Sequence, residues 1–168
     1  AVVSGLVQLL ARRRPGNEEF ADELAATIHA LGRAHDYVRP SGMSSGGKLH
    51  GLLGQIFAAY GNGDGARVRV QGVDCAIGQR AATPLALVFH ELATNSAKYG
   101  ALSQHEGRLR VSWRIEETDR GPSVRLVWQE RHGPVVESPR GKGFGMQLIE
   151  RACAYELGGE PRLDFAPE

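Results

Sequence analysis

Apolar side chains recur at helical spacing along the first forty residues. Val3, Leu6, Val7 and Leu10 form a first group, and Pro15 and Gly16 then interrupt the pattern, because neither residue continues a helix comfortably. A second apolar stripe follows Asn17, which can cap a helix. The members of this stripe are separated by three or four residues, as in coiled coils. Its members are Phe20, Leu24, Ile28, Leu31, His35 and Val38. The pattern predicts an antiparallel helical hairpin over residues 1–40, which needs a partner such as a second copy in a four-helix dimer bundle.

The pattern changes after a stretch rich in Pro, Gly and Ser, from which we expect a linker at residues 41–47. Residues 48–168 then form an expected second domain. Its expected helices cover 49–60, a long segment that ends near Tyr99, and 146–157. Its expected strands are 66–72, 107–115, 124–128 and 161–165.

Apolar side chains and arginines occupy opposite faces of these expected strands. The apolar face holds Val68, Val70, Leu109, Val111, Trp113, Ile115, Val124, Leu126, Trp128, Leu163 and Phe165. The other face holds Arg67, Arg69, Arg108, Arg110, Arg114, Arg125 and Arg162. One apolar face and one solvent-exposed face are typical of a largely antiparallel sheet that helices cover on one side. We therefore predict an α+β fold, in which the helical hairpin precedes a two-layer α/β sandwich.

The composition excludes several classes of protein. With 168 residues, 42% of them hydrophobic, the chain suits one compact domain or a domain with a small appendage. A net charge of +1, and an arginine face without aromatic side chains for base stacking, argue against a nucleic-acid partner. We find neither a signal segment nor the roughly 20 apolar residues of a membrane span. Cys75 and Cys153 lie far apart, so we expect free thiols, a cytoplasmic location and no Cys/His metal site.

The long expected helix carries polar residues on one stripe. Glu91, Asn95, Lys98 and Tyr99 are separated by four, three and one residues, which places them on one side of an otherwise apolar helix. The simpler interpretation is a half-exposed helix whose polar side faces water. The functional one is a ligand site, because a carboxylate and an amide oxygen suit Mg²⁺ and a lysine suits phosphate.

Two further motifs suit a nucleotide. Gly141, Gly143 and Gly145 precede a helix, where close backbone approach and free N–H groups can bind phosphate, although ordinary turns also use glycine. The motif lacks the Lys-Ser/Thr pair of a P-loop and does not follow a strand as in a Rossmann unit. In WQERHGP, Glu130 could accept a hydrogen bond from an adenine amino group, and Gly133 could turn the chain. The alternative is that the segment is simply the end of a strand and the loop after it.

Together the motifs resemble the ATP-binding domain of HWE-type sensor histidine kinases, which has the GHKL (Bergerat) fold. HELATNSAKYGALS is similar to the family's N-box, and Trp128 and Glu130 match the W-x-E of its G1 box. GKGFGMQLI matches the G2 box, and ELGGE is also similar. The N-terminal hairpin, which includes GRAHDYV, resembles the family's dimerisation and phosphotransfer domain. The resemblance covers nearly the whole chain.

The resemblance implies ATP and Mg²⁺ as cofactors and a role for each matching residue. Asn95 would ligate Mg²⁺, and Glu91 would assist the metal or a proton transfer, so these two are the expected catalytic residues. Lys98 would contact phosphates, Tyr99 would line the nucleotide site and Glu130 would read adenine. The other expected nucleotide-binding residues are Gly133, Gly141, Gly143, Phe144 and Gly145. His90 either packs in the core or supports the site.

The sequence departs from the family pattern at two places. His132 stands where the G1 box commonly has its first glycine, and a turn that needs a positive φ would be strained there. The family's acceptor histidine lies in an H-R-x-K-N segment, which none of His29, His35, His50 or His105 matches. We therefore expect a fragment of a longer protein, without its phosphoacceptor and with a clipped last strand.

The leading hypothesis is the catalytic core of a sensor histidine kinase that transfers the γ-phosphoryl group of ATP to a histidine for relay to a response-regulator aspartate. Its expected partners are a second copy, through the hairpin, a response-regulator receiver domain and an upstream sensor domain. The alternative is a phosphotransfer or scaffold protein without enzymatic activity, whose ATP site has decayed. A third possibility, an ATPase switch, has only the spacing of Glu91 and Asn95 in its favour.

Overall fold

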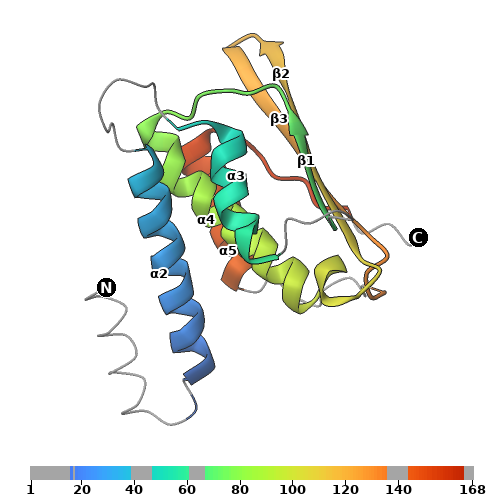
Figure 1. The fold of residues 1–168 in the computed structure, drawn as a ribbon. Helices are drawn as coiled ribbons and strands as arrows, with labels where there is room; N and C mark the ends of the chain where they lie inside the picture. Colours follow the sequence, from blue (N-terminus) through green and yellow to red (C-terminus); the bar gives the residue numbers. More distant parts are fainter. Residues whose placement is uncertain (1–15, 17, 39–46, 61–66, 136–143, 165–168) are drawn as a thin grey trace.

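The computed structural model of the chain describes residues 16, 18–38, 47–60, 67–135 and 144–164 (Figure 1). Its helices are α2 (Glu18–Val38), α3 (Leu49–Phe57), α4 (Gln79–Lys98) and α5 (Phe144–Arg151), and α5 continues as the π-helix η3 (Ala152–Leu157). The 3-10 turns η1 (Ala58–Tyr60) and η2 (Ala101–Ser103) follow α3 and α4. The strands are β1 (Val68–Gly72), β2 (Arg108–Thr118) and β3 (Gly121–Arg131). The expected α+β class is confirmed, whereas the first helix of the expected hairpin lies outside the described residues.

The sheet is mixed. In the described residues its strand order is β1-β2-β3, with β1 parallel to β2 and β2 antiparallel to β3. The β2–β3 hairpin thus has the expected antiparallel arrangement, whereas β1 is parallel, a direction that the sequence pattern did not predict. The reason is the connection: α4 lies between β1 and β2, and a strand–helix–strand crossover makes its two strands parallel.

The strand expected at 161–165 is not observed over its described part. Residues 161–164 have no strand structure, and all of them are exposed. Alternation of apolar and polar residues makes a strand possible, but a stable strand also needs a neighbour that completes its backbone hydrogen bonds.

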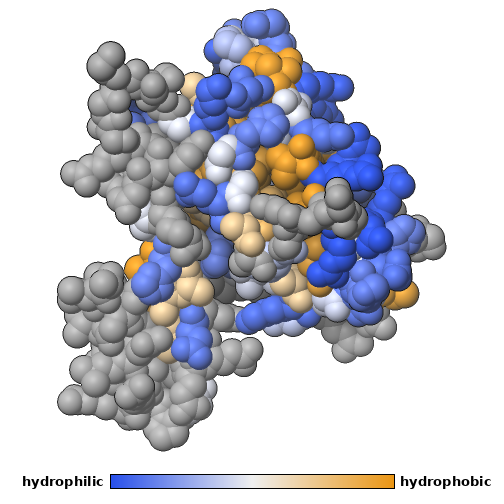
Figure 2. All heavy atoms as spheres, viewed as in Figure 1, coloured by the Kyte–Doolittle hydropathy of each residue, from blue (hydrophilic) through white to orange (hydrophobic). Residues whose placement is uncertain are grey.

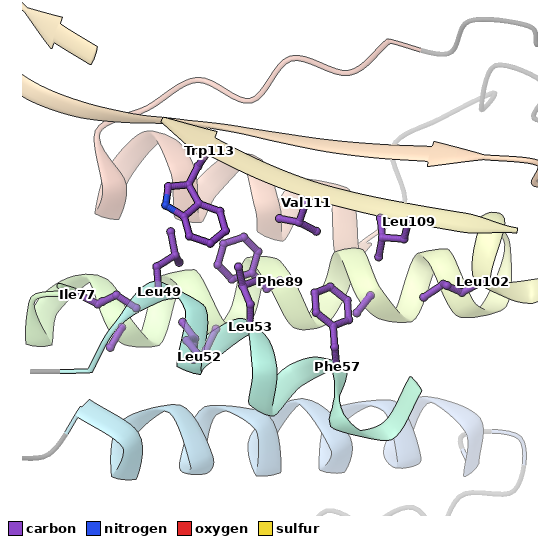
Figure 3. Close-up of a cluster of buried hydrophobic side chains, with 13 residues drawn as sticks. Leu49, Leu52, Leu53, Phe57, Ile77, Phe89, Leu102, Leu109, Val111 and Trp113 are labelled. Atoms are coloured by element: carbon purple, nitrogen blue, oxygen red, sulfur yellow. The ribbon is translucent and has the colours of Figure 1, made fainter. Parts of the chain in front are cut away.

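The core lies between the sheet and the helices α3 and α4 (Figure 3). Leu109, Val111 and Trp113 point from β2 toward Phe89 of α4 and Phe57 of α3, and each of the five is at most 5% exposed. Burying an apolar side chain of this size stabilises a fold by about 1.5–3 kcal/mol. The face of β2 that was predicted to be apolar is therefore the one that packs against the helices.

The β2–β3 hairpin extends beyond the helices that cover the rest of the sheet (Figure 1). Ile115 and Val124 are directly opposite each other in the register, on the face that is buried further along the strands. Each is 46% exposed, and apolar surface is visible on this projecting part of the hairpin (Figure 2). The apolar face of the hairpin is thus only partly covered.

The outer face of the sheet, away from the helices, is rich in arginine. The register places arginines directly opposite one another: Arg69 faces Arg110, Arg108 faces Arg131, and Arg114 faces Arg125. Glu116 is the single acidic side chain that the described strands place on this face, and its carboxylate contacts Arg114. The expected solvated arginine face is confirmed as an exposed face of the sheet.

Helix α2 packs on α4, on the side of the helical layer that faces away from the sheet (Figures 1 and 3). Ala21 and Ala25, one turn apart on α2, are 4% and 5% exposed. Such small side chains let two helices approach closely. Phe20 is 58% exposed and Leu31 is half-buried, so the apolar stripe predicted for a partner helix is only partly covered by the described residues.

Candidate functional site

Three of the predicted site residues meet where α4 passes the beginning of α5. Glu91 and Asn95 are one turn apart on α4, and both side chains are half-buried. A Cβ atom placed on Gly145 would lie 2.8 Å from Glu91 Oε2 and 3.8 Å from Asn95 Nδ2. Glycine therefore allows α5 to begin directly against the carboxylate. The structure joins the long helix with the glycine motif, two segments that are about fifty residues apart in the sequence.

Apolar packing behind the site keeps α5 in this position. Ile149 and Ala152 contact Val88 of α4, and all three are buried. Cys153 packs against the same cluster, and burial raises the pKa of its thiol. The pairing of α4 with α5 and η3 therefore fixes the distance between Glu91 and Gly145.

The Glu91 carboxylate also has a partner on α2. The Thr27 hydroxyl donates a hydrogen bond of 3.3 Å to Glu91 Oε1, while Oε2 is the atom beside Gly145. One carboxylate thus contacts three elements: its own helix α4, the helix α2 and the start of α5. Thr27 could not be identified from the sequence, because no local pattern predicts which helix packs on α4.

Lys98 and Tyr99 lie at the end of α4. Lys98 is the last residue of the helix, and both side chains are exposed, Tyr99 by 66%. The backbone N–H groups of Tyr99 and Gly100 donate to the carbonyl oxygen of Asn95 and end the helix there. Lys98 is therefore on the same helix as Asn95, Tyr99 directly follows that helix, and both side chains are accessible from solvent.

The G1-box pair Trp128 and Glu130 forms a hydrogen bond within β3. Residues two apart in a strand share a face, and Trp128 Nε1 donates to Glu130 Oε1 at 2.9 Å. Glu130 Oε2 accepts the backbone N–H of Ala101 at 2.6 Å. The carboxylate therefore holds the start of η2 on the end of β3. Gly100 is adjacent, and a Cβ atom there would collide with Glu130 Oε2 and approach the Ser96 backbone.

The turn after β3 has the strain expected from the sequence. His132 has a φ of 56°, and it is the single non-glycine residue with a positive φ in the described part of the chain. Gly133 follows, and a Cβ atom placed on it would lie 3.1 Å from the Ala101 backbone. The turn thus brings β3 back against the loop at the end of α4.

The remaining predicted residues are described in part or not at all. Gly141 and Gly143 lie outside the described residues, and Phe144 is described only as the first residue of α5. His90 is half-buried on α4 and takes part in an interaction. Its expected role, in packing or in support of the site, stays open.

The donor set at Glu91 and Asn95 fits Mg²⁺ better than a softer metal. The described residues contain no group of three or more His, Cys, Asp or Glu side chains that could hold a metal ion. Mg²⁺ needs fewer protein ligands, because it keeps several waters and takes phosphate oxygens, with one or two oxygen ligands from the protein. A carboxylate and a carboxamide beside a glycine at a helix start meet that need.

The described helices include none that is long and apolar enough to cross a membrane. Cys75 and Cys153 are both free thiols and partly buried. Burial is also the main cause that raises the pKa of Cys75.

Known proteins similar to this chain are histidine kinases. Residues 1–74 match the family model described as HWE histidine kinase. The chain is 37% identical over 170 residues to blue-light-activated histidine kinase 1 of Erythrobacter litoralis (strain HTCC2594), covering 99% of this chain and 46% of that protein. It is 32% identical to a blue-light-activated histidine kinase of Brucella anthropi, covering 97% of this chain and 34% of that protein. The chain thus spans less than half the length of these relatives.

A solved histidine kinase domain from the Erythrobacter litoralis EL346 blue-light activated histidine kinase has a similar fold. The two structures superpose with a TM-score of 0.54 at 14% sequence identity, covering 92% of this chain and 74% of that one. At this identity the likeness concerns the fold. The sequence relatives and the family model, taken together, confirm the resemblance that the motifs predicted: residues 1–74 match the HWE histidine kinase model, and nearly the whole chain is similar to histidine kinases.

Proposed function

We propose that this chain is the ATP-binding catalytic core of a sensor histidine kinase. The observation that carries the proposal is the meeting of Glu91 and Asn95 with Gly145 at the start of α5. A carboxylate and a carboxamide beside a helix start suit a metal-bound triphosphate, because the helix N-terminus attracts the anion while the metal compensates its charge. The similarity to histidine kinases supports the same reaction class.

In the proposed site, each residue acts through binding or positioning. Asn95 holds Mg²⁺ with Glu91 as a second candidate ligand, and Glu91 is alternatively placed to accept a proton. Lys98 meets the phosphates from the exposed end of α4, and Tyr99 lines the nucleotide. Gly141, Gly143, Phe144 and Gly145 cover the phosphates. Bound Mg²⁺ would supply charge neutralisation of the triphosphate, and the chain's contribution is largely orientation of the reacting group.

Glu130 and Gly133 would form the adenine end of the site. Each carboxylate oxygen of Glu130 accepts one hydrogen bond, from Trp128 or from Ala101. A carboxylate offers about four acceptor positions, so the two that remain can take an adenine amino group. The internal hydrogen bonds would then fix the carboxylate before the nucleotide arrives.

The complete reaction extends beyond this chain. We propose that the γ-phosphoryl group passes to a histidine and then to an aspartate of a response-regulator receiver domain. The chain would act as a homodimer through the helical hairpin of residues 1–40, with residues 41–47 as linker and 48–168 as the catalytic domain. No histidine of this sequence has the family's acceptor context, so we assign no phosphoacceptor in it. A sensor domain elsewhere in the full-length protein would supply the signal. The protein would act in the cytoplasm.

The direct test is nucleotide binding by the Asn95→Ala variant. Titration calorimetry with ATP and MgCl₂ should give binding for the wild-type chain and none for the variant, because the loss of a metal ligand leaves the triphosphate charge uncompensated. Ser103→Ala, on the exposed turn η2, is the matched control and should bind like the wild type. Circular dichroism should show that both variants are folded. Unchanged affinity of Asn95→Ala for ATP with magnesium present would disprove the site assignment.

One observation favours a second function. The left-handed His132 replaces a glycine of the family pattern, and strain beside the adenine end would weaken a nucleotide site. A phosphotransfer or scaffold protein without kinase activity is therefore the alternative, and absence of ATP binding by the folded wild-type chain would support it. Steady phosphate release without a phosphoprotein would instead support an ATPase.

A further inference from the structure

The Glu91 carboxylate lies between two elements that have different partners. Its Oε1 accepts the hydrogen bond from Thr27 of α2, and its Oε2 is beside Gly145 of α5. A flexible glutamate side chain on a helix can adopt several rotamers, and hydrogen bonds restrict them. The hydroxyl of Thr27 thus selects the rotamer that keeps Oε2 at the glycine.

The hydrogen bond between Thr27 and Glu91 is partly buried, so solvent weakens it less than it would a surface contact. Thr27 therefore restricts the orientation of the Glu91 side chain.

Thr27 belongs to the stripe of α2 that could receive another helix. It follows Phe20 and Leu24 and precedes Leu31 at gaps of four, three and four residues, which places all four on one side of the helix. Ala21 and Ala25, which are buried, lie on another face of α2. Thr27, which contacts Glu91 of α4, therefore belongs to a stripe that the described residues cover only in part.

We infer that Thr27 is a positioning residue for Glu91, through which the placement of α2 controls the Mg²⁺-nucleotide site. The inference rests on the proposed function of that site. A helix advances about 1.5 Å per residue, so a shift of α2 along α4 by one residue breaks a hydrogen bond of 3.3 Å. Packing of a further helix on the stripe of Phe20, Leu24 and Leu31 would change the position of α2, and Thr27 transmits that change to Glu91.

The test compares Thr27→Val with Thr27→Ser in the chain as it stands. Valine keeps the shape of threonine and lacks the hydroxyl, whereas serine keeps the hydroxyl. We expect Thr27→Val to raise the Kd for ATP in MgCl₂ about threefold to tenfold, the range for one hydrogen bond to a charged group that is partly exposed. The Kd for ATP in EDTA should not change. Thr27→Ser should restore the wild-type Kd, and Ala26→Val, on the exposed side of α2, should leave it unaltered.

A double-mutant cycle with Glu91→Gln completes the test. In the Glu91→Gln background, Thr27→Val should have no further effect on the magnesium-dependent affinity, because the carboxylate that it orients is gone. Equal weakening with and without magnesium, or a Thr27→Ser variant as weak as Thr27→Val, would show a merely structural role and overturn the inference. A folded wild-type chain that binds no nucleotide overturns the proposed function instead. The same double-mutant cycle can be measured with the free energy of unfolding in urea. It then shows whether Thr27 and Glu91 stabilise the fold together, and a coupling energy of zero would refute the contact itself.

Discussion

His132 occupies a backbone conformation that suits glycine. At a φ of 56° the Cβ atom of an L residue crowds its own backbone, which costs about 1–2 kcal/mol. Glycine avoids this cost but loses roughly 0.5–1 kcal/mol through the greater freedom of the unfolded chain. The balance favours glycine at this position.

We therefore predict that His132→Gly raises the free energy of unfolding by up to about 1.5 kcal/mol, as the difference between these two contributions. Urea denaturation followed by circular dichroism would measure the change. Arg131→Gly is the matched control, because Arg131 is the preceding residue, at the end of β3, and is not among the residues with a positive φ. The control should lose stability. Equal losses in the two variants would show that no strain is relieved at His132.

The sequence predicted which candidate site residues share one face of an element, because this depends on local spacing. Glu91 and Asn95 lie on one stripe because of the helical period, and Trp128 and Glu130 lie on one face because of the strand period. Their meeting with Gly145 was expected only from the family resemblance. The donors to Glu130 and the contact of Thr27 with Glu91 could not be predicted, because they depend on how separate elements pack. No local pattern contains that information.

The elements differ in how well the pattern predicted them. The helix that ends near Tyr99 and the alternating faces of β2 were predicted correctly, because each has a continuous period. The direction of β1 was not predicted, and the strand expected at 161–165 is not observed over its described residues. Strand direction follows from the connection through α4, and a strand at the end of the chain depends on a partner that its own residues do not supply.

For α2, we predict that the stripe containing Leu31 mediates a dimer. Leu31→Asp should raise the dimer dissociation constant by about a hundredfold or more, because an unpaired charge in a buried seam costs several kcal/mol. Sedimentation velocity over a range of concentrations would measure it. Ile28→Asp is a less clean test, since Ile28 is near the buried face of Ala21 and Ala25.

Ala26→Asp is the control for this prediction, because Ala26 lies on the exposed side of α2. The dimer dissociation constant of the Ala26→Asp variant should equal that of the wild type. A wild-type chain that stays monomeric at high concentration would contradict a dimer through this helix.

At the scale of the whole molecule, the structure has a sheet, a helical layer and α2 on the far side of that layer (Figure 1). The expected order of a helical hairpin before a two-layer domain did not include this stacking. Hydrophobic periodicity shows that α2 has an apolar stripe, but it does not show that Thr27 contacts Glu91 of α4. The proposed coupling of α2 to Glu91 follows from that contact.

The facing arginines on the outer side of the sheet make the folded molecule respond to dissolved ions. Three pairs of like charges are held in register there, with Glu116 as the one acidic side chain of the described strands on that face, and unfolding lets them move apart. Salt shortens the range of this repulsion, from about 30 Å at 0.01 M to about 8 Å at 0.15 M. We predict that the free energy of unfolding in urea rises between these two NaCl concentrations. Arg131→Gln removes one member of a pair and should reduce the rise of the free energy of unfolding with salt. Arg162→Gln, outside the strands, should leave that rise unchanged. A free energy of unfolding that falls with salt would mean that attractive charge pairs outweigh the facing arginines.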